Sequence, residues 1–253
     1  MTMEKKSVRV GGCTLGEGMA KICVPVMGDT ARAMAAHAAR AREAGADLIE
    51  LRIDSLSAEP SSEEAVAACH AVRAAGLPVL FTMRTARDGG PGTAALPAYE
   101  ALLAAVIEAG CCDAVDIELS VGEAAFARLA ALAHAHGVPV VGSSHEFGEL
   151  GDPVRAHDWL TAQHALGADV CKAAVMARSR SEAFAGAWQM ARAGEEIAAP
   201  VIAIVMGPYG LFTRAACENV GSCLTFAAAG AASAPGQMDA GTLRGVLEAL
   251  HGA

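Results

Sequence analysis

Residues 122–142, GEAAFARLAALAHAHGVPVVG, contain a helix and the strand that follows it. Apolar residues recur at helical spacing as far as His136, and Gly137 is the residue type that most often ends a helix. A short apolar run then begins at Val138. Because helices and apolar runs of this kind alternate along the whole chain, the sequence predicts parallel strands joined by helices.

Eight apolar runs are predicted to be strands, and eight alanine-rich segments are predicted to be helices. The strands are expected at residues 22–26, 47–53, 79–83, 114–119, 138–142, 168–175, 201–206 and 222–227. The helices are expected at residues 30–44, 61–75, 96–109, 122–136, 154–166, 181–198, 211–219 and 239–251. Eight such units in 253 residues favour an α/β fold of the (β/α)8 or TIM barrel type over an open doubly wound sheet. A solenoid ranks lower, because the units share no common motif.

Two further features concern the ends and the continuity of the chain. Residues 7–16 precede the first unit, and we expect them to form an N-terminal β-hairpin that closes the bottom of the barrel. No linker divides the chain, so residues 1–253 are predicted to form a single barrel domain.

Composition limits the possible class of protein. The chain is 53% hydrophobic and 19% charged, which excludes a disordered chain. No apolar run reaches the ~20 residues of a membrane-spanning helix, and the N-terminus has no signal-peptide pattern, so we expect a cytoplasmic protein without a membrane partner. The formal net charge of -9 argues against a nucleic-acid partner. The eight cysteines form no C-x-x-C pair and are interpreted as buried thiols.

Lys172 is the strongest candidate for a catalytic residue. Only four of the 19 basic residues are lysines, and Lys172 is the single lysine after residue 21. It lies in a predicted buried strand, where an unpaired ammonium group is strongly unfavourable. A desolvated lysine can present a free amine to a carbonyl group, which arginine cannot do. The alternative is a buried lysine held in an ion pair.

Other functional side chains are predicted at the carboxyl ends of the strands, where a barrel carries its active site. Glu50, Arg52 and Asp54 share one face of the second strand by its two-residue period. The remaining residues at or shortly after strand ends are Arg84, Asp116, Glu118, His145, Lys172, Met206 and Arg214. An amine nucleophile, a histidine base and several arginines at one rim suit an anionic, hydroxylated ketone as substrate.

Each of these residues also has a structural interpretation. Glu50, Arg52 and Asp54 could form an ion network at the barrel mouth, and we assign Asp54 to that role. His145, considered alone, could be an ordinary core or surface histidine. No set of His, Asp and Glu residues has the spacing of metal ligands, so no metal site is expected.

The order of the motifs resembles that of type I 3-dehydroquinate dehydratases. Each motif is weakly specific by itself, whereas their number and order are specific. The resemblance rests on residues 22–28 (ICVPVMG), 46–54 (ADLIELRID), 81–84 (FTMR), 116–119 (DIEL), 144–147 (SHEF), 172–175 (KAAV), 206–214 (MGPYGLFTR) and 233–237 (SAPGQ).

The resemblance implies dehydration of 3-dehydroquinate to 3-dehydroshikimate by syn elimination, a lyase reaction of the shikimate pathway to aromatic amino acids. It implies that Lys172 forms a Schiff base with the substrate ketone and that His145 is the general acid and base. It also implies that no cofactor is required and that the protein is a homodimer.

The resemblance further assigns residues that bind the substrate or support the site. Glu50, Arg52 and Arg84 would hold the ring hydroxyls and order the site. Arg214, Ser233 and Gln237 would bind the substrate carboxylate. Glu118 would support His145 or Lys172, and Asp88 and Met206 are further supporting residues. Asp88 stands where the family usually has glutamate, whose side chain is one methylene longer.

Two other functions remain open from the sequence. A class I aldolase-type barrel would also use a Schiff-base lysine on the sixth strand, but such enzymes commonly bind phosphate, whereas Arg214 and Gln237 favour a carboxylate. A catalytically silent, metabolite-binding regulatory barrel would be expected to lack the lysine or the histidine, and both are present.

Overall fold

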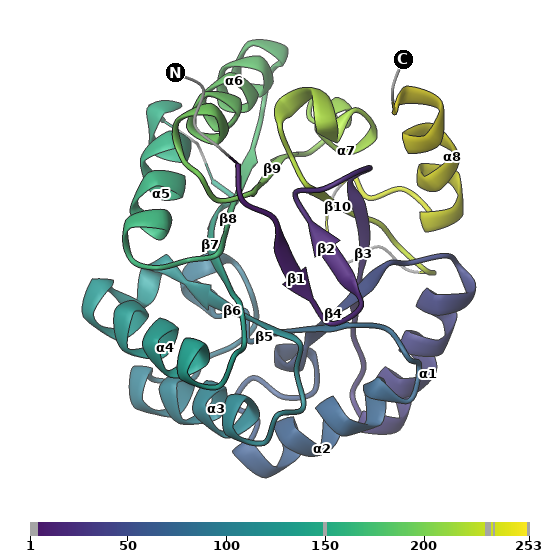
Figure 1. The fold of residues 1–253 in the computed structure, drawn as a ribbon, viewed down its shortest axis with the longest axis vertical. Coiled ribbons are helices and arrows are strands. Elements are labelled where there is room, and N and C mark those ends of the chain that lie inside the picture. The colour runs from purple at the N-terminus through teal and green to yellow at the C-terminus, as the bar shows by residue number, and fades with distance from the viewer. Residues whose placement is uncertain (1–4, 149–150, 231–233, 235, 252–253) are drawn as a thin grey trace.

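The computed structural model describes residues 5–148, 151–230, 234 and 236–251. Eight parallel strands form one sheet in the order β10-β3-β4-β5-β6-β7-β8-β9. They are β3 (Lys21–Val26), β4 (Leu48–Arg52), β5 (Val79–Thr82), β6 (Ala114–Glu118), β7 (Val140–Glu146), β8 (Val170–Met176), β9 (Val201–Met206) and β10 (Leu224–Phe226). A bridge between Val201 and Ser222 brings the two ends of the sheet together, and Figure 1 shows the resulting nearly closed ring. The predicted TIM barrel is confirmed.

Helices surround the strands (Figure 1). They are α1 (Ala31–Glu43), α2 (Ser62–Arg73), α3 (Leu96–Glu108), α4 (Glu123–Ala135), α5 (Val154–Ala165), α6 (Arg180–Glu196), α7 (Phe212–Ala215) and α8 (Ala240–Leu250). Local sequence sets their ends: Ser61 caps α2 in a reciprocal capping box with Glu64. After α4, Gly137 adopts the left-handed φ of +69° that turns the chain back toward the barrel, as its position predicts.

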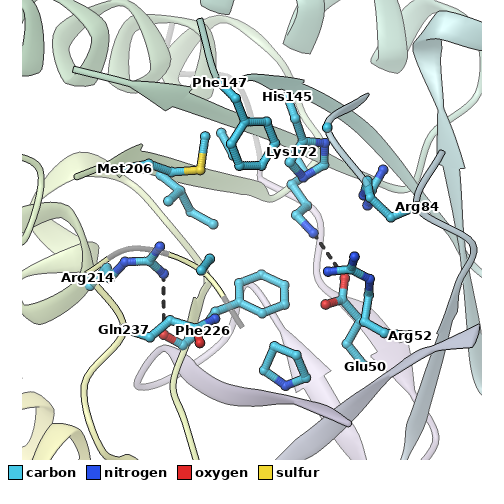
Figure 2. A pocket seen from close by; sticks show the side chains of 15 residues that line it. Glu50, Arg52, Arg84, His145, Phe147, Lys172, Met206, Arg214, Phe226 and Gln237 are labelled. Atoms are coloured by element: carbon cyan, nitrogen blue, oxygen red, sulfur yellow. Dashed lines mark hydrogen bonds and ion pairs between the residues drawn. The ribbon is translucent and has the colours of Figure 1, made fainter. Parts of the chain in front are cut away.

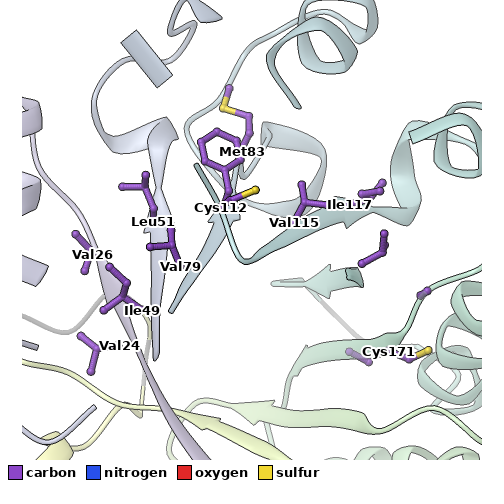
Figure 3. Close-up of a cluster of buried hydrophobic side chains, with 14 of the residues drawn as sticks. Val24, Val26, Ile49, Leu51, Val79, Met83, Cys112, Val115, Ile117 and Cys171 are labelled. Atoms are coloured by element: carbon purple, nitrogen blue, oxygen red, sulfur yellow. The ribbon is translucent and has the colours of Figure 1, made fainter. Parts of the chain in front are cut away.

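Strand side chains alternate between two apolar clusters. Ile49 and Leu51 pack outward with residues of other strands in the cluster shown in Figure 3, whereas Leu48 faces the barrel interior. This alternation directs Glu50, between Ile49 and Leu51, into the interior as well. The same two-residue period puts the polar side chains of several strands inside the barrel.

The predicted N-terminal hairpin is also confirmed. β1 (Val8–Val10) and β2 (Cys13–Leu15) pair antiparallel. Figure 1 shows the hairpin lying across the end of the barrel. Val10, Cys13 and Leu15 are buried in the interior cluster, together with residues at the start of the strands such as Leu48 and Val170. The hairpin therefore closes the end at which the strands begin.

Most predicted bounds lie within two residues of those in the structure, but two elements end more than two residues from their predicted bound. The fifth strand was expected to end at residue 142, but β7 continues to Glu146. Its extra residues are polar, and Ser143 remains buried because its hydroxyl donates to Asp116 inside the barrel. The helix expected at residues 211–219 is the short α7 followed by a 3-10 turn, η4 (Cys217–Val220). The carbonyl of Arg214 accepts a hydrogen bond from the hydroxyl of Thr225. It therefore does not serve as the acceptor that the next turn of a continuing helix would need.

The cysteines and the helix lengths agree with the compositional argument. All eight cysteines are free thiols, and all but the half-buried Cys223 are buried. Within the described ranges, the structure contains no helix with the length and apolar character needed to span a membrane.

Candidate active site

Lys172 lies inside the barrel on β8 and is only 3% exposed. Its Nζ is 3.2 Å from Oε1 of Glu50 on β4 and 3.8 Å from Oδ2 of Asp116 on β6. The ring of Phe226 on β10 lies beneath the ammonium group, 4.3 Å from Nζ to the ring centroid. Side chains from three other strands thus hold the lysine amine in one place.

Glu50 is the nearest carboxylate to that amine. Burial would raise the pKa of Glu50, but Lys172, Arg52 and Arg84 together hold this pKa below its ordinary value. The hydroxyl of Thr82 also donates to Oε1 of Glu50 at 3.2 Å. Glu50 is therefore ionised at neutral pH and carries a negative charge beside the lysine.

Arg84 lines the same cavity as Lys172 and fixes part of its wall. Its guanidinium donates to Asp116, Glu118 and Ser143, each at 2.9 Å. Burial opposes the charge of Arg84, but the carboxylates around it, Asp116 and Glu118 foremost and then Asp88 and Glu50, raise its pKa well above the ordinary value. These bonds fix the guanidinium between β5, β6 and β7.

Glu118 was expected to support His145 or Lys172, and the hydrogen bonds that it makes involve other residues. Glu118 accepts hydrogen bonds from the side chain of Arg84 and from the backbone N–H and hydroxyl of Thr85. Asp116, two residues earlier on the same inward face of β6, is the carboxylate of this strand that lies beside Lys172.

His145 and Asp88 form a second polar pair. Nδ1 of His145 is 3.1 Å from Oδ2 of Asp88, so the shorter aspartate does reach the histidine.

Burial raises the pKa of Asp88 to about 6, although Arg84 acts in the opposite direction. Burial, followed by the charges of Arg84, Lys172 and Arg52, holds the pKa of His145 well below its ordinary value. At neutral pH the histidine is therefore uncharged and the aspartate mainly ionised. We assign the ring proton to Nδ1, facing Asp88, which leaves Nε2 as the basic nitrogen.

The loop after β5 sets the position of Asp88. The 3-10 turn η2 (Ala86–Asp88) ends at Gly89, which has a left-handed φ of +75°. A Cβ at Gly89 would collide with the ring of Phe147. That ring stacks nearly parallel to His145, with centroids 6.4 Å apart. Gly89 therefore allows Phe147 to lie close to the loop while it stacks on the catalytic candidate.

Arg214 lies on the other side of the site from Arg84 (Figure 2). It comes from α7, is 2% exposed, and has its pKa lowered to about 10 by burial, so it stays charged at neutral pH. Its guanidinium donates to the carbonyl of Phe226 and points toward Gln237 in Figure 2. Arg214 and Gln237 thus present donors to the same space.

Arg52 and Asp54 form the ion network that the sequence suggested at the mouth. Nε and Nη2 of Arg52 donate to the two carboxylate oxygens of Asp54 at 2.9 and 2.7 Å. Asp54 also accepts from the backbone N–H of Arg84. Because β4 ends at Arg52, Asp54 lies in the following 3-10 turn, η1 (Ile53–Ser55), and does not continue the strand face as expected.

These side chains enclose a cavity of about 130 Å³ (Figure 2). Most of the predicted site residues line it. They are Glu50, Arg52, Arg84, His145, Lys172, Met206, Arg214 and Gln237. Asp88 and Glu118 are not among the lining residues. Asp88 is hydrogen-bonded to His145, and Glu118 accepts a hydrogen bond from Arg84. Ser233 is outside the described residues.

The site includes Phe147, Phe226 and Asp116, for which the sequence predicts no role. Phe147 and Phe226 line the cavity, and Asp116, which was expected at a strand end, lies beside the lysine. A period-two signal was present for Asp116, which shares the inward face of β6 with Glu118. Phe226 could have been found from the same period on β10, since Leu224 and Phe226 both pack inside the barrel.

Comparison with known proteins gives a consistent result. A sequence model described as type I 3-dehydroquinase matches residues 22–253. The chain is 36% identical to the 3-dehydroquinate dehydratase of Listeria welshimeri, over 96% of this chain and 98% of that protein. It is also 36% identical to the enzyme of that name from Bacillus licheniformis, over 98% of both chains.

Solved structures agree with the sequence comparison. The 3-dehydroquinate dehydratase of Geobacillus kaustophilus superposes with a TM-score of 0.93 at 31% identity, covering 99% of this chain and 98% of that one. The type I enzyme of Clostridium difficile, solved with covalently modified comenic acid, gives a TM-score of 0.89 at 31% identity, with 98% of both chains covered. On its sequence and its architecture, this chain belongs to the type I 3-dehydroquinase family.

Proposed function

We propose that this protein dehydrates 3-dehydroquinate to 3-dehydroshikimate through a Schiff base on Lys172. The observation that carries the proposal is the position of Lys172, whose amine lines a cavity opposite Arg214 and beside a neutral histidine. Family membership supports the reaction, and the cavity supports the assignment of roles. The same proposal includes a cytoplasmic homodimer built from single-domain subunits.

In the first step, the ammonium group of Lys172 gives up one proton, and the resulting amine attacks the C3 ketone. The ketone oxygen then leaves as water, with that proton and one further proton of the amine, and a protonated imine remains. The imine carries the positive charge that the ammonium group carried before. Glu50 and Asp116, at 3.2 and 3.8 Å from Nζ, are placed to stabilise that charge. The iminium withdraws electrons from C2, so the route calls for no organic cofactor.

In the second step, Nε2 of His145 takes a proton from C2 and the electron pair forms an enamine. The enamine expels the C1 hydroxyl, which leaves as water after receiving a proton from His145. The C1–C2 double bond forms and the imine is regenerated. Hydrolysis then releases 3-dehydroshikimate and restores Lys172. Asp88 holds the ring of His145 throughout by accepting from Nδ1.

Substrate orientation follows from the charges on the cavity wall. Arg214 and Gln237 would bind the carboxylate, and Ser233 would add a hydroxyl donor. Glu50 would accept hydrogen bonds from the ring hydroxyls, and Arg52 would donate hydrogen bonds to them. Arg84 is already bonded to Asp116, Glu118 and Ser143, so its main role is to order the site.

Reductive trapping tests the proposal. Borohydride added to the protein with 3-dehydroquinate should reduce the imine and leave a stable mass adduct on Lys172, measured by intact mass and peptide mapping. The variant Lys172→Met should give no adduct and no turnover, whereas Lys21→Met, at the opposite end of the barrel, should give both. Absence of an adduct in the unmodified protein would sink the mechanism. An adduct without turnover would indicate the silent, metabolite-binding barrel.

A further inference from the structure

Gln163 is a buried polar side chain on a helix outside the ring of strands. It is 0% exposed and belongs to α5, two residues before that helix ends at Ala165. A short turn follows, in which the main-chain carbonyl of Gln163 accepts a hydrogen bond from the N–H of Ala168, and the chain then enters β8. Gln163 is not among the residues that line the cavity, so it can affect the reaction only through other residues.

The side-chain amide of Gln163 makes three hydrogen bonds, two of them to the main chain of Lys172. Its Oε1 accepts from the N–H of Lys172 at 2.9 Å, and its Nε2 donates to the carbonyl of Lys172 at 3.0 Å. Nε2 also donates to the hydroxyl of Ser144 at 3.0 Å. Because a main-chain N–H can only donate and a carbonyl can only accept, these contacts fix the orientation of the amide.

These bonds join the two strands that carry the proposed nucleophile and the proposed base. Lys172 lies on β8, and Ser144 lies on β7 immediately before His145. The side chains of Lys172 and His145 line the cavity (Figure 2), whereas that of Ser144 points outward to α5, as the two-residue period of a strand requires. One amide outside the barrel therefore restrains the main chain at Lys172 and next to His145.

The close approach of α5 to these strands depends on Gly142 of β7. A Cβ at this position would lie 3.0 Å from the Cβ of Gln163 and 2.9 Å from that of Ala168. Contacts this short would push α5 outward and move the amide away from Lys172. The sequence therefore provides both the amide and the space that lets it reach the strand.

Loss of the amide would deprive two buried main-chain groups of Lys172 of these partners, which costs free energy. The strand can recover hydrogen bonds by shifting against its neighbours, β7 and β9. Such a shift would displace the Lys172 amine from its place 3.2 Å from Glu50, whereas Arg214 comes from α7 and would stay. Because attack on a carbonyl needs the reacting atoms aligned at about 3–3.5 Å, a small displacement slows it.

We propose that Gln163 is a positioning residue of the active site. Its amide holds β8 against β7, so that the amine of Lys172 and the ring of His145 keep the spacing that the reaction requires. The effect on rate rests on the proposed dehydration, whereas the positions of the two side chains can be measured without it.

Gln163→Met tests the proposal, because methionine has a similar length but forms none of the three bonds. Its kcat should fall about tenfold, and borohydride quenching at short times should show the imine forming about tenfold more slowly. KM should change by less than about twofold, because Arg214 and Gln237 are untouched. The matched control is Ser222→Ala, which removes a buried hydroxyl that accepts from the N–H of Ala203 and donates to the carbonyl of Leu224. It should also lower the urea midpoint but keep kcat and the trapping rate.

Ser144→Ala is a second, milder variant, since it removes one of the three bonds and leaves both bonds to Lys172. Its kcat should fall about threefold. Added to Gln163→Met, it should cause no further loss, because the bond between the two side chains is already absent.

Crystal structures of the unmodified protein and of Gln163→Met separate this proposal from the proposed function. Displacement of the Lys172 amine relative to His145 would support positioning even if the unmodified protein forms no borohydride adduct, a result that overturns the proposed function alone. An undisplaced amine, an unchanged kcat in a protein that does turn over, or additive losses in the double variant would each overturn the role of Gln163. If Gln163→Met does not fold, the structure and kcat of Ser144→Ala decide in the same way.

Discussion

Asp88 controls the tautomer of His145, and this coupling gives the site a defined pH dependence. When ionised, Asp88 accepts a hydrogen bond from Nδ1–H and leaves Nε2 basic. When protonated, it can donate to Nδ1 instead, and the ring proton then occupies Nε2. Because burial raises the pKa of Asp88 to about 6, while that of His145 lies well below its ordinary value, the aspartate is the group that titrates first as pH falls from neutrality.

We therefore expect kcat/KM to fall as pH decreases through about 6. Asp88→Asn should lower kcat on the order of a hundredfold, because the ring loses its charged partner, and should abolish the acid limb near pH 6. Asp88→Glu keeps a carboxyl group and should keep an acid limb. Initial rates measured between about pH 5 and 9 test this. If Asp88→Asn retains the same acid limb, the limb belongs to another group.

At the scale of elements, the loop after β5 positions Asp88 beside His145, and the shape of this loop depends on Gly89. Gly89 ends η2 in a left-handed conformation, and the ring of Phe147 occupies the space that a side chain would need. The ring of Phe147 can therefore keep this position against the loop only if residue 89 lacks a Cβ.

Gly89→Ala should lose activity as well as stability. A left-handed alanine costs about 1–2 kcal/mol, and the displaced Phe147 should lower kcat about tenfold. Gly137→Ala is a matched control, since Gly137 is also left-handed but has nothing within 4 Å of an added Cβ. It should lose similar stability and keep kcat. Urea denaturation and steady-state kinetics of both variants make the comparison, and equal kcat values would contradict the proposed role of the loop.

The elements also show where period-two reasoning holds. It placed Glu50 and Arg52 at the cavity that Lys172 also lines, because β4 continues as far as these two residues. It failed for Asp54 because β4 ends at Arg52, and a hydrogen-bonded turn then replaces the strand geometry. Strand ends depend on partners in neighbouring strands, which local sequence does not specify.

At the scale of the whole molecule, the barrel and the placement of Lys172 and His145 could be predicted, because repeated units and a rare residue type carry strong signals. The contacts of Glu118 could not. They depend on the direction of the Arg84 side chain, whose guanidinium reaches β6 and β7 from the segment that follows β5. Phe147 was missed because its role depends on a glycine more than fifty residues earlier in the chain.

The closed and open ends of the barrel should respond differently to mutation. Leu15 of the hairpin is 1% exposed and packs with residues at the start of the strands, such as Leu48 and Val170. Lys172 and His145 lie further along their strands, toward the open end.

Leu15→Ala should lower the free energy of unfolding by about 2–4 kcal/mol through the lost contacts and the cavity left behind, with no change in kcat. Thr14→Ala, on the other face of β2, should change it by less than about 0.5 kcal/mol. Denaturant unfolding and turnover of both variants measure the two quantities. A fall in kcat for folded Leu15→Ala would mean that the hairpin is coupled to the active site and does more than close the barrel.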